Sequence, residues 1–497
     1  MRSTRFTRNT LSLALALLSA NMACAAAGDL ELYVDSTTKQ IFAEPGPNRV
    51  KMGTFRPVTE AAAPAATSSA ISASAAGSGV PVVDLSALET KVKQQDEKIA
   101  SLAATQSKSG WTNNIQMRGY AQLRYNEMVG GDRGINLWTD RSVGDQDSLG
   151  DSDKNLVIRR ARVVIEGSLG SRASFKIEPD FSTTVSGSLN VVQIREAFGE
   201  INLTDDKVNR VRVGATKVPF GFQELMSSSA WMTFDSSDAF ESAVKDERDT
   251  GAFYFYTPKD IQARFSEIAA AGLKHTGNYG LFAVGAYNGE GLNKAEKNDG
   301  MHWVARATYP WKFSNGQFFE ASVQAYTGEF VPTTGAYRAA GDISKTPIIP
   351  NTNLWGYRDR RVGVSAVWFP QPFGVQAEWN WGKSPQLDLA SNTITDGNVD
   401  GGYLQAMYMI ATSHGSLVPF IRWQSYSGGN KLETNAPYNE VNDTELGLKW
   451  LLAKEVEFTT EYHHMNRNNL VTGNRPGRID YLNFNADALR FQVQFNY

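Results

Sequence analysis

Apolar and polar side chains alternate one by one along the stretch ALRFQVQFNY, so that an extended chain places Phe491 and Phe495 on one face and Arg490 and Gln494 on the other. Strict alternation is typical of a β-strand with two unlike faces. The same pattern recurs in IQMRGYAQLRY, ASFKIEPDF, GVQAEWNWG, VNDTELGLKW and VEFTTEYHH. It predicts about sixteen strands, starting near residues 115, 155, 173, 190, 209, 268, 280, 301, 317, 360, 373, 402, 417, 441, 455 and 488.

The connections between these strands alternate in length. Long polar segments such as NEMVGGDRGINLWTDRSVGDQDSLGDSDKN, VPTTGAYRAAGDISKTPIIPNTNLWGYRD and HMNRNNLVTGNRPGRIDYLN are separated by tight ones such as SLGSR, TGNYG, PQP and TSHGS. An up-and-down barrel that carries its short turns on one rim produces this order. The predicted fold is therefore all-β, a transmembrane antiparallel up-and-down β-barrel of about 16 strands, formed by residues 113–497.

The two faces of the predicted strands require different surroundings. Charged groups on the polar face are costly to bury without water or partners, so we expect this face to line an aqueous lumen. We expect the apolar face to contact outer-membrane lipid. A barrel of about sixteen strands leaves a passage, whereas side chains fill a barrel of about eight. After the N-terminus no apolar run reaches the ~20 residues of a membrane helix, which excludes a helical membrane protein.

The N-terminus predicts export. Three arginines within the first eight residues, a leucine-rich stretch and the small residues Ala25 to Ala27 are typical of a signal peptide over residues 1–27. The chain's one cysteine, Cys24, lies inside this peptide, so the mature chain is expected to have none. A lipoprotein cysteine is the less favoured alternative, because the usual leucine three places earlier is missing.

Three further segments precede the predicted barrel. Residues 28–56 are predicted to be a short extended segment, and the Ala/Ser/Pro-rich residues 57–83 a linker. Residues 84–107 are predicted to form a short periplasmic coiled-coil helix that joins identical chains. The heptad positions a and d hold Leu85, Leu88, Val92, Ile99 and Leu102. A surface helix packed on its own domain is the alternative.

Composition and motifs narrow the class of protein. The formal charge is -3, from 49 Lys+Arg and 52 Asp+Glu, which gives no overall attraction to nucleic acid. The sequence has no H-E-x-x-H, P-loop, cysteine cluster or G-x-S-x-G motif. We therefore predict that the protein is not an enzyme, with no catalytic site, no metal site and no cofactor.

Two internal stretches, IRRARVVIEGSLGSRASFKIEPDFS and VNRVRVGATKVPFGFQELMSSSAW, together with the closing strand, resemble the phosphate-selective porin O and P family of Gram-negative bacteria. The resemblance extends over about Gln116 to Tyr497 and implies a sixteen-stranded trimeric porin whose third extracellular loop narrows the pore. Family members that select phosphate line the pore with a ladder of arginines. The resemblance matches Arg118, Arg159 and Arg160 with the start of this ladder. At the constriction, Glu224 stands where the resemblance implies a phosphate-binding lysine, and a carboxylate there would repel phosphate.

Alternate residues of a strand point to opposite faces, so the odd or even position of a residue in its strand, its parity, gives an independent prediction of the pore lining. The basic residues on inward phases are Arg118, Arg124, Arg160, Arg162, Lys176, Arg210 and Arg212. The segment predicted to fold inward, about 218–248, supplies Glu224, Asp235, Asp238, Glu241 and Asp246, with Lys245 and Arg248 among them. A basic wall facing an acidic loop produces a transverse field that orients polar solutes. Arg159 has the opposite parity to Arg160 and is expected to face lipid or the rim unless a bulge intervenes.

Each of these sets also has a simpler interpretation. The arginines can balance the charge of paired lumen groups, and the acidic segment can be a solvated extracellular loop. At the level of function, the first hypothesis is a trimeric outer-membrane porin for small inorganic anions, with phosphate or similar oxyanions preferred. The alternatives are a general, weakly selective porin and a structural envelope barrel whose conductance is incidental.

Overall fold

The computed structural model describes residues 30–35, 41–42, 49–55, 93–98, 114–132, 135, 137–140, 142–143, 154–185, 188–336, 349–350, 353–472 and 479–497. The predicted signal peptide and linker lie outside the described residues, as does most of the predicted coiled coil. The chain divides into two compact units, Met1–Thr90 and Lys91–Tyr497.

The first unit contains a small antiparallel sheet. Its strands β1 (Leu30–Asp35), β2 (Ile41–Phe42) and β3 (Arg49–Phe55) lie in the order β2-β1-β3. The extended segment predicted over residues 28–56 therefore folds back on itself twice. At the start of the second unit, residues 93–98 are helical and exposed, within the segment predicted as a coiled coil.

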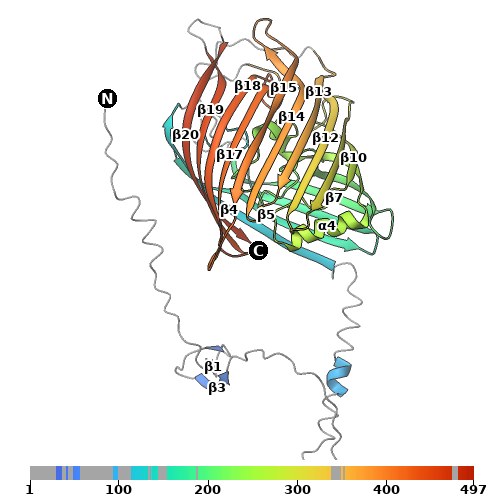
Figure 1. The fold of residues 1–497 in the computed structure, drawn as a ribbon, viewed down its shortest axis with the longest axis vertical. Helices are drawn as coiled ribbons and strands as arrows, with labels where there is room; N and C mark the ends of the chain where they lie inside the picture. Colours follow the sequence, from blue (N-terminus) through green and yellow to red (C-terminus); the bar gives the residue numbers. More distant parts are fainter. Residues whose placement is uncertain are drawn as a thin grey trace, which may run out of the picture. The chain divides into compact units, whose positions relative to one another are not determined.

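The rest of the second unit is a closed antiparallel barrel of 16 strands, drawn from cyan to red in Figure 1. The first eight elements are β4 (Ile115–Gly131), β5 (Lys154–Leu169), β6 (Ala173–Val185), β7 (Ser188–Asn202), β8 (Asn209–Lys217), β9 (Arg248–Tyr256), β10 (Phe282–Tyr287) and β11 (His302–Lys312). The others are β12 (Phe318–Phe330), β13 (Tyr357–Trp368), β14 (Phe373–Asp388), β15 (Thr393–Tyr408), β16 (Ile410–Thr412), β17 (Gly415–Gly429), β18 (Tyr438–Leu451), β19 (Val456–Thr472) and β20 (Ile479–Asn496). The short β16 continues β15, because both pair with β17.

Antiparallel pairing between β20 and β4 closes the barrel. At this seam the Gly119 amide donates to the Tyr497 carbonyl oxygen at 2.6 Å, and the Tyr497 amide donates back at 3.0 Å. Within β20, Phe491 is 44% exposed on the outer face and Arg490 is 1% exposed on the inner face. The alternation in the closing stretch is thus explained by an apolar outer wall and a polar inner wall. Among the described residues, no helix is long and apolar enough to cross a membrane.

The prediction of a strand near residue 268 is wrong. Residues there form α4 (Lys259–Ala270), whose Ile261, Phe265 and Ile268 make one buried apolar stripe, the spacing of an amphipathic helix. TGNYG is accordingly the end of a long connection, not a tight turn. The strand that the sequence reading missed is β9, whose inward Phe253 and Phe255 pack in an apolar cluster. Because both faces of β9 are aromatic or apolar, its alternation is hidden.

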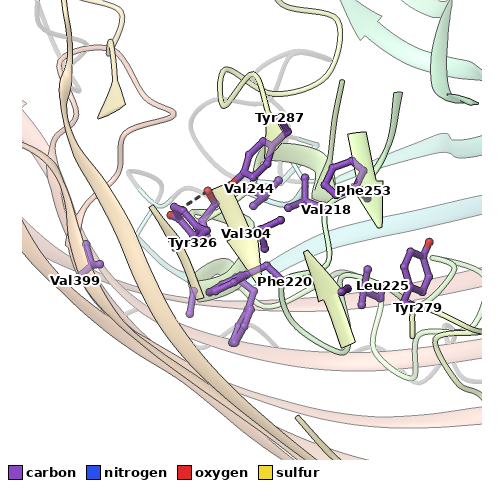
Figure 2. Packing of buried hydrophobic residues seen from close by; sticks show 14 of the residues in the cluster. Val218, Phe220, Leu225, Val244, Phe253, Tyr279, Tyr287, Val304, Tyr326 and Val399 are labelled. Carbon is purple, nitrogen blue, oxygen red and sulfur yellow. Dashed lines mark hydrogen bonds between the residues drawn. The ribbon is translucent and has the colours of Figure 1, made fainter. Parts of the chain in front are cut away.

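Residues 218–247, between β8 and β9, fold into the barrel and are called the inward loop below. The inward loop contains α3 (Asp238–Glu241) and the 3-10 turn η2 (Lys245–Glu247). Its apolar residues join a buried cluster with several strands of the wall, and Figure 2 shows Phe220 and Val244 among Val304, Tyr326 and Val399. The ring centroids of Phe220 and Tyr326 are 5.0 Å apart, edge to face. The inward loop is therefore anchored to the wall by a shared hydrophobic core.

Candidate functional site

A bulge in β5 brings two successive arginines to the lumen. The register between β4 and β5 passes from Gln122 opposite Arg160 to Leu123 opposite Ile158, so Arg159 is the extra residue. A bulge places one unpaired residue in a strand and changes the side to which side chains point. The Arg159 guanidinium donates to the Thr139 carbonyl oxygen at 2.6 Å. Parity places Arg159 toward lipid or the rim unless a bulge intervenes, and this bulge brings its guanidinium to the inner side, beside Asp140 and Asp235.

Four arginines meet around two carboxylates from different loops. Asp235 of the inward loop lies 2.9 Å from Arg124, 2.8 Å from Arg490 and 3.4 Å from Arg160. Asp140, from the connection between β4 and β5, lies 2.5 Å from Arg124 and 2.6 Å from Arg490. Arg159 approaches both carboxylates, at 3.5 and 3.8 Å. We call Arg124, Arg159, Arg160 and Arg490, with Asp140, Asp235 and Glu461, the arginine cluster.

The sequence analysis missed three members of this cluster, Arg490, Glu461 and Asp140. Arg490 has the inward parity of the closing strand, so the alternation alone contained the signal that places it in the lumen. Asp140 lies in a long connection, where the sequence has no periodicity, and no pattern indicated that its carboxylate would reach the barrel interior. Its position depends on tertiary contacts with Arg124 and Arg490, which sequence patterns do not reveal.

The loop carboxylates of the arginine cluster are held in their charged form. Burial alone would raise the pKa of Asp235, but Arg124 and Arg490 hold this pKa well below its usual range. Burial acts in the same direction on Asp140, whereas Arg124 and Arg159 lower its pKa to about 2. Both carboxylates are therefore anions bound inside a basic pocket of the lumen.

The remaining basic residues predicted to line the pore are paired along the wall of β5 to β8. Arg162 lies 2.7 Å from Asp180. Lys176 lies 2.6 Å from Glu196 and 2.9 Å from Glu178. Glu200 binds two cations, with Arg210 at 3.0 Å and Arg212 at 2.8 Å. Arg118 is different, because its side chain is 55% exposed near the rim, where it lies 3.2 Å from Glu166.

Glu224 is buried within the inward loop, and its carboxylate does not line a passage. It is 1% exposed, and neither carboxylate oxygen has a hydrogen-bond partner among the described residues. Burial, with repulsion from Glu247 and Glu241, raises the pKa of Glu224 well above its usual range. The neutral acid is favoured, so Glu224 does not present the repelling charge to phosphate that the sequence led us to expect. The nearby cation is Lys217, which donates to the Glu224 carbonyl oxygen at 2.6 Å.

The other predicted residues of the inward loop are distributed between its two sides. Asp238 lies 2.5 Å from Arg467 of β19, the strand next to β20. Glu241 is buried, and its Oε1 accepts a hydrogen bond of 3.0 Å from the Asp246 amide. Lys245 is half-buried, and Asp246 is 40% exposed beside Arg195 of β7. The acidic face of the loop is thus divided, and Asp235 is the member that meets the arginine cluster.

Comparisons with known proteins identify the kind of barrel. A family model described as phosphate-selective porin O and P matches residues 133–497. No curated protein sequence matches the chain. A solved structure of the outer membrane channel DcaP of Acinetobacter baumannii is similar, at 13% identity over 77% of this chain and 97% of that one, with a TM-score of 0.46. The anion-selective porin from Comamonas acidovorans is similar at 11% identity over 77% and 99% of the two chains, with a TM-score of 0.45.

Proposed function

Because the chain belongs to the phosphate-selective porin O and P family and is an outer-membrane porin, we propose that it favours small hydrophilic anions, with phosphate or similar oxyanions as the preferred solutes. The rim with the short turns faces the periplasm, as in barrels of this class. We further propose that three copies assemble side by side in the membrane.

One observation carries the proposed anion preference. In the arginine cluster four guanidinium groups face three carboxylates, since Glu461 lies 3.4 Å from Arg490. The cluster keeps one excess positive charge at the level where the inward loop narrows the lumen. A positive charge at a narrow, low-dielectric point attracts anions and repels cations. Planar guanidinium groups also match the oxygens of phosphate in geometry.

A second candidate function is a general, weakly selective porin. The pairing of Arg162, Lys176, Arg210 and Arg212 with carboxylates supports it. If solutes pass along this wall and not beside the arginine cluster, the local charge is close to balanced, and selectivity is weak. The two candidates place the path of the solute beside different groups of charged residues on the lumen wall.

Recordings from planar lipid bilayers distinguish these functions. In a salt gradient the reversal potential of the wild-type porin is expected to indicate anion preference. Arg160→Glu reverses the sign of the excess charge, so the anion-to-cation permeability ratio is expected to fall about tenfold. Arg118→Glu, at the exposed rim, is the matched control and is expected to change this ratio far less.

Each other outcome points to an alternative. An unchanged ratio in Arg160→Glu would remove the arginine cluster from the path and favour the weakly selective porin. Failure of the folded wild-type protein to conduct would favour the structural barrel.

A further inference from the structure

The connection between β9 and β10 is unusual for the periplasmic rim. It contains α4 and then residues 271–281, which we call the strap. Figure 1 shows α4 at the end of the barrel where the C-terminus lies. Gly272 ends the helix with φ +70 and bonds back to the Ala269 carbonyl oxygen at 2.9 Å, a helix ending that glycine favours. The chain then leaves the helix axis and enters the strap.

The buried side of α4 packs on the inward loop. Ile261, Phe265, Ile268 and Leu273 are 0–6% exposed and share one apolar cluster with Phe222, Met226 and Trp231 of that loop. The strap adds a second contact, because Tyr279 belongs to the same apolar cluster as Leu225 (Figure 2). The helix and strap therefore lie under the inward loop, within the mouth of the barrel.

An ion pair connects the strap to the wall on the opposite side of this mouth. The ammonium group of Lys274 lies 2.9 Å from Oε1 of Glu457, at the start of β19. The strap is attached to the wall at β10, and in the closed barrel seven strands separate β10 from β19 in either direction. The two ends of this contact therefore belong to opposite walls. The strap lies over the lumen and does not follow the rim.

The same ion pair is connected to the arginine cluster. The other oxygen of Glu457 lies 2.9 Å from Lys449 of β18. Lys449 donates a hydrogen bond of 2.8 Å to the Trp231 carbonyl oxygen of the inward loop. The guanidinium carbon of Arg160 lies 5.0 Å from the centroid of the Trp231 ring. Polar contacts thus run from Lys274 to the arginine cluster.

We propose that α4 and the strap form a second constriction at the periplasmic mouth, in series with the inward loop, and that the Lys274–Glu457 pair holds it narrow. Lys274 is a specificity-determining residue in this arrangement, because its cation lies over the lumen at this mouth. The pair is weak enough to open, since the Lys274 side chain is 36% exposed and water screens such pairs. This inference rests on the proposed function only in that solutes cross the lumen.

Single-channel recording of the purified full-length protein tests the proposal. Lys274→Glu places like charges across the mouth, so the conductance is expected to rise by about two- to fivefold, the range of equilibrium shift that a partly exposed ion pair supplies. Lys274→Arg keeps the cation and is expected to conduct as the wild type does. The matched control is Arg172→Glu, which makes the same charge change in an exposed pair with Asp205 that stays on the rim.

A second experiment tests the crossing itself. Cysteines in place of Lys274 and Glu457 are expected to be bridged by a cleavable thiol-reactive crosslinker, and bridging is expected to lower the conductance until the bridge is cleaved. Failure to bridge would overturn the proposal, as would a Lys274→Glu channel that conducts like the wild type or like the Arg172→Glu control. A silent wild-type barrel would instead contradict the proposed function, and the bridging result would still test the strap.

Discussion

Asp235 occupies the place that a passing anion would take. Its carboxylate accepts hydrogen bonds from Arg124 and Arg490, at 2.9 and 2.8 Å, and these are the contacts that a phosphate oxygen would seek. The chain therefore provides its own anion where the inward loop meets the arginines of the wall. A permeating oxyanion has to compete with this carboxylate or pass beside it, which sets a limit on how tightly the cluster binds solutes.

Asp235→Asn tests this competition. The change removes one negative charge and keeps the size of the side chain, so the excess positive charge of the arginine cluster rises by one. We expect the anion-to-cation permeability ratio to rise about three- to tenfold. Reversal potentials in a salt gradient measure the change. Asp205→Asn on the exposed rim is the control, and an equal ratio in the two variants would contradict the assignment.

Glu241 gives the inward loop a pH dependence. Burial, with repulsion from Asp246 and Glu247, raises the pKa of Glu241 from 4.5 to about 8. Because the folded value is the higher one, the stability contributed by the neutral acid is present below about pH 4.5 and is lost as the pH rises through about 8. The attraction of Lys245 acts against the rise in pKa.

Glu241→Gln is expected to remove this dependence, which amounts to at most about 1.4 kcal/mol per pH unit. Thermal unfolding of the barrel between pH 5 and 8 measures it. The exposed Glu296→Gln is the control and is expected to retain the wild-type slope. If Glu241→Gln unfolds with the wild-type slope, another group causes the pH dependence.

At the level of elements, apolar packing fixes the position of the inward loop. Phe240 of α3 is fully buried, and its ring centroid lies 5.7 Å from that of Phe220. Gly221 lies directly beneath it with φ +87, and a Cβ there would come within 2.8 Å of the Phe240 ring. The loop backbone and the ring therefore fit each other closely, and the position of Asp235 depends on this fit.

Phe240→Ala is expected to loosen the inward loop. Truncation of a buried phenylalanine typically lowers folding stability by about 3–5 kcal/mol. Here we expect it to destabilise the packed position of the inward loop, while the hydrogen bonds of the wall remain. We expect larger current fluctuations and faster proteolysis within residues 218–247. The lipid-side Phe495→Ala is the control, because Phe495 is 50% exposed. Fluctuations equal to those of the control would show that the ion pairs alone hold the loop.

The elements also show what the sequence could predict. Alternation located most strands and placed Arg124, Arg160 and Arg162 in the lumen, because a wet inner wall and an apolar outer wall impose a period of two. It failed at β9, whose inner face packs against the apolar side of the inward loop and therefore has no polar period. It also failed at Arg159, since one extra residue in β5 shifts the parity without any change in composition.

At the level of the whole molecule, the outer wall has two unlike halves. Exposed tryptophans lie on β11, β13, β14 and β17, at Trp303, Trp311, Trp368, Trp381 and Trp423. Among the described strands, those from β4 to β10 carry no tryptophan. Tryptophan rings concentrate where a protein meets the interface of a bilayer. We therefore expect β11 to β17 to face lipid and the wall from β4 to β10 to face other copies in the proposed trimer.

Matched cysteine variants test this orientation. Ile158 of β5 and Ile421 of β17 are similarly exposed, at 49% and 46%. In membranes Ile158→Cys is expected to crosslink between copies, and Ile421→Cys is not. Electrophoresis under oxidising conditions detects the linked species. The reverse pattern would place β11 to β17, and not β4 to β10, at the interface between copies. Equal crosslinking from both positions would contradict a fixed interface.

The pairing of β20 with β4 governs the order in which this protein can fold. Gln122 and Gln494 bond at the seam although 372 residues separate them. Until β20 arrives, β4 retains an open edge, which is a template for wrong pairing and aggregation. Contacts this distant in the chain also form slowly. The barrel therefore cannot close before its last strand arrives, and until then the edge of β4 stays unpaired.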